Sequence, residues 1–209
     1  MRKCSLIGVV GMVAMMSIAG VVHASVVEGF DTNNAGWQIG YGSNFTSPQL
    51  SANWVSSGGN LGGYISGSAN NLYATWTYDP SPFGDMTGMT MTVDTMITGN
   101  ASGTAQLYVG RGGTYFIDGT WPISTDTVWT THQAVLDSAN FVPWTGVNNN
   151  LYTLAQVLAA PDDVGIFFGG GLASGDGLLN IDNFGVVPEP ATMTLLGLGA
   201  MAMLRRRRA

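Results

Sequence analysis

The central part of this chain lacks cysteine and has almost no basic residues. The single cysteine, Cys4, lies near the N-terminus. Residues 25–187 can therefore form no disulfide and offer no thiolate as a nucleophile or metal ligand. They contain twelve acidic side chains and one base, Arg111, which gives them a net charge of −11. Because such a surface repels phosphate backbones, we expect no nucleic-acid binding.

Histidine and glutamate are also scarce, which limits the enzymes that residues 25–187 could form. They contain one histidine, His132, and no Gly-x-Ser-x-Gly motif accompanies it. Glu28 is their only glutamate, so a glycosidase would need two aspartates as its catalytic pair. The scattered aspartates considered for this role are Asp79, Asp85, Asp94, Asp118 and Asp126. Because aspartate is favoured in turns, we interpret them as turn residues and expect no catalysis.

The N-terminal residues have the pattern of a secretory signal. Arg2 and Lys3 supply the positive charge, residues 5–22 are apolar, and Val22-His23-Ala24 has the small residues of a signal peptidase site. We predict a signal peptide over residues 1–24, formed as a helix and removed by signal peptidase.

The C-terminal residues form a second segment of this kind. Val187-Pro188-Glu189-Pro190 precede 14 residues without charge, 191–204, and the cluster Arg205, Arg206, Arg207 and Arg208. The prolines break the chain before the apolar stretch. As a helix, that stretch would span about 21 Å, short of the roughly 30 Å of a bilayer core. Because arginine side chains reach the headgroups and favour the cytoplasmic side, we predict a membrane anchor with its C-terminus in the cytoplasm.

The order of these three parts resembles the PEP-CTERM sorting signal, a tail also labelled an ice-binding-protein C-terminal domain. This family is found on secreted proteins of Gram-negative bacteria. The resemblance implies recognition by an exosortase, a membrane cysteine protease that cuts near Pro188-Glu189-Pro190. It also implies transient anchoring in the inner membrane and a final place at the cell surface or in an exopolysaccharide matrix.

Residues 25–187 have the length of one domain and the pattern of an all-β sandwich. Short strand-like runs alternate with Gly, Asn, Asp and Pro. In residues 86–97, for example, Met89, Met91 and Val93 point to one face at a period of two. The best helix candidate is 151–160, which Thr153 could cap and Pro161 ends.

Several motifs in this domain resemble the laminin B (domain IV) module. They are Gly59-Asn60-Leu61-Gly62-Gly63-Tyr64-Ile65, Phe83-Gly84-Asp85, Trp129-Thr130-Thr131 and Ile181-Asp182-Asn183. Leu61 stands where the family has proline, and the Phe83 motif is one residue short. The resemblance covers about residues 37–184 and implies a jelly-roll β-sandwich like those of carbohydrate-binding modules.

The metal that this composition favours is calcium, because one histidine and no cysteine argue against zinc and oxygen ligands suit calcium. Jelly-roll carbohydrate-binding modules often hold a structural Ca²⁺ between the first and last strands. Glu28, Asp31 and Asp182 are the matching positions here. The alternative is that these are separate surface carboxylates.

The six tryptophans are divided by their sequence context between the core and a ligand surface. Trp37, Trp76 and Trp129 lie in strand-like runs, and we predict that they are buried. Trp54, Trp121 and Trp144 lie beside Pro, Gly or Asn, and we predict that they bind sugar rings from loops.

Together these patterns predict a secreted bacterial surface or matrix protein. We call its central domain, residues 25–187, the body, and we expect it to bind a polysaccharide or another surface component without catalysis. One alternative is a polysaccharide hydrolase that depends on aspartate. Another is a structural coat or ice-interacting protein, which the threonines at 87, 90 and 92 weakly suggest.

Overall fold

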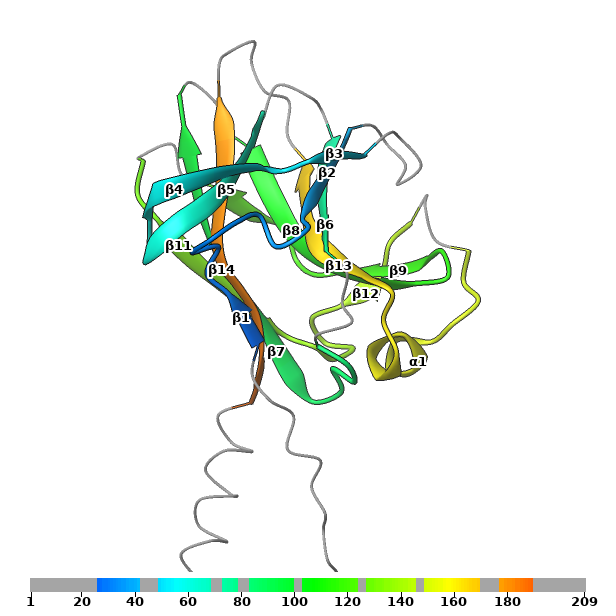
Figure 1. Cartoon of the computed structure of the whole chain (residues 1–209). Helices are drawn as coiled ribbons and strands as arrows, with labels where there is room; N and C mark the ends of the chain where they lie inside the picture. Colours follow the sequence, from blue (N-terminus) through cyan, green and yellow to red (C-terminus); the bar gives the residue numbers. More distant parts are fainter. Residues whose placement is uncertain are drawn as a thin grey trace, which may run out of the picture.

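The described chain is a sandwich of two antiparallel β-sheets (Figure 1). The computed structural model describes residues 26–41, 49–68, 73–78, 83–99, 103–123, 127–145, 149–169 and 177–189. The predicted signal peptide and apolar tail helix lie outside these ranges. Within them, no helix has the length and apolar character needed to span a bilayer.

The six-stranded sheet has the order β11-β7-β14-β5-β4, and β1 pairs with β14 on the side of β5. Its strands are β1 (Val26–Glu28), β4 (Asn53–Gly59), β5 (Gly62–Ser68), β7 (Met89–Thr98), β11 (Thr130–Val135) and β14 (Leu178–Pro188). The last described strand, β14, is therefore central in this sheet.

The eight-stranded sheet has the order β12-β9-β8-β13-β6-β2-β3, and β10 pairs with β8. Its strands are β2 (Gln38–Tyr41), β3 (Gln49–Ser51), β6 (Tyr73–Tyr78), β8 (Gly103–Arg111), β9 (Thr114–Ile117), β10 (Trp121–Ile123), β12 (Val142–Pro143) and β13 (Asp163–Gly169). The all-β sandwich prediction is thus confirmed.

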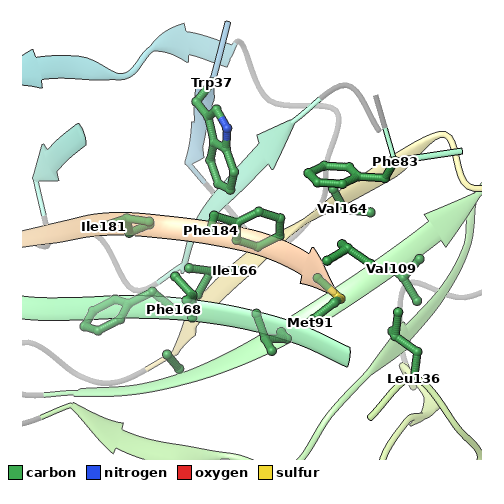
Figure 2. Close-up of a cluster of buried hydrophobic side chains, with 14 of the residues drawn as sticks. Trp37, Phe83, Met91, Val109, Leu136, Val164, Ile166, Phe168, Ile181 and Phe184 are labelled. Atoms are coloured by element: carbon green, nitrogen blue, oxygen red, sulfur yellow. The ribbon is translucent and has the colours of Figure 1, made fainter. Parts of the chain in front are cut away.

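The core lies between the sheets, where the inward residues of each strand meet. Met89, Met91 and Val93 are at most 1% exposed, so the alternation read from the sequence is confirmed. Ile166 of β13 lies in the other sheet (Figure 2) and pairs with Leu107 of β8, and both residues are fully buried.

Trp37 anchors one end of this core, as the sequence predicted. It is fully buried, and its ring meets Phe184 edge-on with centroids 4.7 Å apart (Figure 2). Trp129 does not follow the core prediction, because it is half-buried just before β11 and meets Tyr64 edge-on at 5.6 Å. The side chain of Trp76 lies outside the described part.

The helix prediction for 151–160 is confirmed by α1 (Leu154–Ala159). Thr153 is its N-cap and forms a capping box with Gln156, so two of the amides at the helix start find partners. Val157 and Leu158 pack under the eight-stranded sheet and close one end of the sandwich.

Candidate functional site

The outward face of the eight-stranded sheet carries a group of aromatic side chains. Tyr108 of β8 lies opposite Gly165 of β13, and the neighbouring pair is Gln106 with Phe167. Because side chains alternate along a strand, these residues point away from the core that Leu107 enters. Tyr115 of β9 lies opposite Gly110 on the same face.

Trp144, which follows β12, lies across this group. Its ring centroid is 4.6 Å from Phe167, 6.0 Å from Tyr108 and 6.3 Å from Tyr115. Tyr108 has no exposed surface although it points outward, whereas the other three rings remain partly exposed. We call Tyr108, Tyr115, Trp144 and Phe167 the aromatic face.

Glycines give the tyrosine rings room on this face. A Cβ atom at Gly110 would collide with the ring of Tyr115, and Gly165 stands where a side chain would lie beside Tyr108. Because no side chain projects from the sheet at these two glycines, the tyrosine rings can lie flat against the backbone.

One carboxyl group, that of Asp163, borders the aromatic face. The Tyr108 hydroxyl donates a hydrogen bond to Asp163 Oδ1 over 3.2 Å. Burial raises the pKa of Asp163 to about 7, although its hydrogen bond from Tyr108 acts in the opposite direction. Burial and the nearby Asp163 charge also raise the pKa of both Tyr108 and Tyr115, so these hydroxyls stay protonated and can donate.

Of the three predicted ligand-binding tryptophans, only Trp144 belongs to the aromatic face. The prediction placed all three in loops, but Trp54 lies in β4 and Trp121 begins β10. Trp54 Nε1 donates to the carbonyl of Phe30 over 2.6 Å, at the edge of the six-stranded sheet. A proline next to Trp121 suggested a loop, but β10 accommodates Pro122 at the edge of its sheet.

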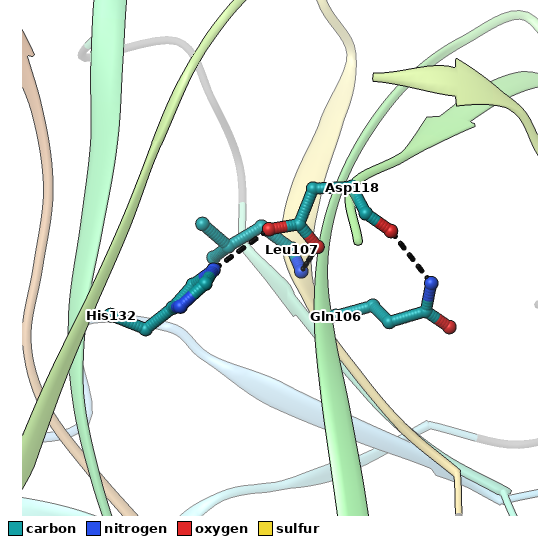
Figure 3. Close-up of polar contacts among 4 residues, drawn as sticks. All are labelled: Gln106, Leu107, Asp118 and His132. Carbon is teal, nitrogen blue, oxygen red and sulfur yellow. Dashed lines mark hydrogen bonds and ion pairs between the residues drawn. The ribbon is translucent and has the colours of Figure 1, made fainter. Parts of the chain in front are cut away.

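Sequence reasoning missed a hydrogen bond between His132 and Asp118 that joins the two sheets. His132 Nε2 of β11 lies 2.8 Å from Asp118 Oδ2, which follows β9 (Figure 3). Asp118 Oδ1 also accepts a hydrogen bond from the amide of Leu107. Burial raises the pKa of Asp118, and the contact with His132 opposes that shift.

The ring of Trp121 stacks on His132 with centroids 3.6 Å apart and an interplanar angle of 12°. This stack covers the hydrogen bond between His132 and Asp118 at the border between the sheets. Both His132 and Trp121 thus have partners within the fold.

Two of the laminin-like motifs meet on the outward face of the six-stranded sheet. Asp182 of β14 accepts hydrogen bonds from the amides of Asn60 (2.7 Å) and Leu61 (3.4 Å) in the turn between β4 and β5. Its other oxygen accepts from the amide of Asn183 over 2.8 Å. Asp182 is fully buried, and burial raises its pKa against the effect of these hydrogen bonds.

Asp94 of β7 lies directly opposite Asp182 and completes this polar cluster. It accepts hydrogen bonds from the side chains of Asn60 (2.7 Å), Asn183 (2.8 Å) and Thr131 (2.5 Å). The aspartates of the cluster therefore fix the hairpin turn onto the sheet, which is a structural task.

The residues predicted as calcium ligands show no common metal site. Glu28 pairs with Phe184 in the β1–β14 ladder, Asp31 is exposed, and Asp182 is occupied by backbone amides. Among the described residues, no three acidic, histidine or cysteine side chains are close enough to hold a metal ion. The calcium site stays a prediction.

Comparison with known proteins identifies the C-terminal segment. Residues 186–208 match the PEP-CTERM protein-sorting motif, so the recognition of the tail is confirmed. The motif indicates a secreted protein that is sorted by way of the membrane. Among curated proteins, no sequence matches this chain.

Solved structures resemble the sandwich. One is a family 11 carbohydrate-binding module of a cellulosomal cellulase from Clostridium thermocellum, with a TM-score of 0.53, 16% identity, and coverage of 79% of this chain and 95% of the module. Another is the L4b domain of human laminin alpha-2, with a TM-score of 0.53, 7% identity, and coverage of 80% and 99%. An exo-beta-agarase also matches, with a TM-score of 0.51, 14% identity, and coverage of 79% and 25%.

These likenesses concern the fold alone, and they confirm the jelly-roll sandwich that the laminin-like motifs implied.

Proposed function

We propose that this protein is exported, processed by an exosortase, and binds polysaccharide through the aromatic face without catalysis. The observation that supports this role most directly is the group of three partly exposed rings, Tyr115, Trp144 and Phe167, beside the carboxyl of Asp163. The sorting motif at 186–208 supports the surface location.

The chemistry of the aromatic face suits a sugar chain. Apolar C–H faces of sugar rings pack on aromatic rings, and hydroxyl groups exchange hydrogen bonds with neighbouring polar groups. The hydroxyl oxygen of Tyr115 can accept, Gln106 can donate and accept, and Asp163 can accept or donate according to its protonation. Because the body carries a net charge of −11, it favours neutral or basic glycans over acidic ones.

The test is a glycan array probed with the secreted, processed protein, followed by titration of the best ligand. We expect Trp144→Ala to weaken binding at least about tenfold, because it removes the ring that contacts the other three. Trp54→Ala is the matched control, since Trp54 lies in the other sheet, and it should bind as the unmodified protein does. Full binding by a folded Trp144→Ala protein would refute the aromatic face as the site.

The hydrolase alternative is favoured by one observation, the pKa of about 7 that burial gives to Asp163. A general acid needs a pKa of this kind, but a glycosidase also needs a second carboxyl group. The adjacent Asp162 is occupied by a hydrogen bond from the Gly112 amide over 2.7 Å. Release of reducing sugar that is lost in Asp163→Asn would establish the enzyme in place of the binding module.

A further inference from the structure

The sorting motif begins inside the folded sandwich. Its first residue, Val186, has no exposed surface and pairs with Met91 of β7 on one side and with Val26 of β1 on the other. Val187 and Pro188 continue the ladder opposite Thr90 and Met89. The first three residues of the motif are therefore part of the central strand β14.

A paired strand of this kind is a poor protease substrate. Proteolysis takes place where the backbone is exposed and can leave its hydrogen-bond partners. Cleavage before Pro188 would require β14 to separate from β7, and cleavage before Val186 would also separate it from β1. Met89, opposite Pro188, is itself 1% exposed, so the end of the ladder is anchored in the core.

The N-terminus of the body lies at the same end of β14. Val26, which pairs with Val186, is two positions from the predicted signal peptidase site after Ala24. Two proteases would thus act next to each other, at the end of the sandwich where β1 begins and β14 ends (Figure 1).

We infer that the folded sandwich sets the limit of exosortase processing, so that the cut falls on the C-terminal side of Pro188 and β14 stays intact. In this step water adds across one peptide bond. The carbonyl carbon gains the water oxygen and becomes a carboxylate, and the departing nitrogen takes both hydrogens of the water and leaves as an ammonium group. The inference rests on the proposed sorting route and adds that the body is processed while folded.

The first measurement is the intact mass of the processed protein after the full chain is expressed with an exosortase. We expect the mature C-terminus to be Pro188 or a later residue. A mature chain that ends at Val187 or earlier would overturn the inference. Failure of the exosortase to cut the full chain would overturn the proposed sorting route, and this inference with it.

The second measurement cross-links β14 to β7 before the exosortase acts. Thr90→Cys combined with Val187→Cys places two thiols on directly opposed positions of β7 and β14, where a disulfide can form. Residues 25–187 contain no other cysteine. We expect the oxidised and reduced forms to be cut at equal rates, because β14 need not open.

The reduced double variant is the matched control, since it carries the same two substitutions without the cross-link. If the reduced form is cut and the oxidised form resists, β14 must open during processing and the inference is wrong.

Discussion

Alanine at position 63 is expected to destabilise the sandwich by about 3 kcal/mol or more, the upper part of the range for overpacked sites. Gly63 is the second residue of β5, and it lies against the backbone of Phe30. A Cβ atom there would collide with the carbonyl oxygen of Phe30, and would lie 2.9 Å from Trp54 Nε1 and 3.0 Å from the carbonyl oxygen of Val55. Two of these three atoms belong to the backbone and cannot turn aside.

Chemical denaturation of the purified protein measures this effect, and Gly119→Ala is the control. Gly119 has no positive φ angle, and a Cβ atom added there would meet no other atom within 4 Å. Its replacement should change the free energy of unfolding by less than about 0.5 kcal/mol. Equal stabilities for the two variants would mean that the turn shifts to accept a side chain.

A large pH-dependent effect is expected from Asp163→Asn. The pKa of Asp163 is about 7 in the folded protein, against about 3.9 for an unfolded chain. The folded state therefore binds more protons between these values, and its stability falls as pH rises from about 4 to 7. Asparagine is always neutral and can still accept the Tyr108 hydrogen bond, so the variant escapes this loss.

Thermal or chemical unfolding at several pH values measures the difference. We expect the two proteins to be about equally stable near pH 4, and the variant to be more stable by on the order of 2–4 kcal/mol at pH 8. Asp85→Asn, which replaces an exposed turn carboxyl, should follow the unmodified protein throughout. A stability gap that does not widen with pH would show that Asp163 ionises normally in the folded state.

The sequence was sufficient for features that depend on local pattern. Met89, Met91 and Val93 alternate with polar residues, and burial of one strand face follows directly from that period. Thr153 and Pro161 mark a helix by backbone chemistry alone, and α1 lies between them. The turn motif of residues 59–65 needs its glycines for close backbone approach, so its resemblance to laminin-like domains carried information about the fold.

The aromatic face could not be read in this way, because its members come from four separate segments. Tyr108, Tyr115, Trp144 and Phe167 meet only through the β12-β9-β8-β13 order, which the sequence does not state. Asp163 appeared as one of many aspartates, since its environment is made by residues far away in the chain. The contact between His132 and Asp118 was missed for the same reason, because it joins two different sheets.

Neighbouring residue types also misled the reading of the tryptophans. Trp121 and Trp54 looked like loop residues because proline or asparagine stands next to each, yet both lie in strands at sheet edges. Trp129 looked like a core residue because a Thr-rich strand follows it. Its ring instead meets Tyr64 edge-on, and its Nε1 donates to the carbonyl of Gly58 over 3.2 Å. These contacts form where the turn of the β4–β5 hairpin reaches β11, at the opposite edge of the sheet.

The pairing of β1 with β14 has a consequence for the timing of folding. Val26 and Val186 are about 160 positions apart, and β14 separates β4 and β5 from β7 and β11. Until β14 is available, these two halves of the sheet have no strand to join them. Contacts of such long range slow folding. A secretory chain of this topology therefore cannot complete its fold during synthesis or passage across the membrane. It remains unfolded enough for export until β14 has crossed the membrane.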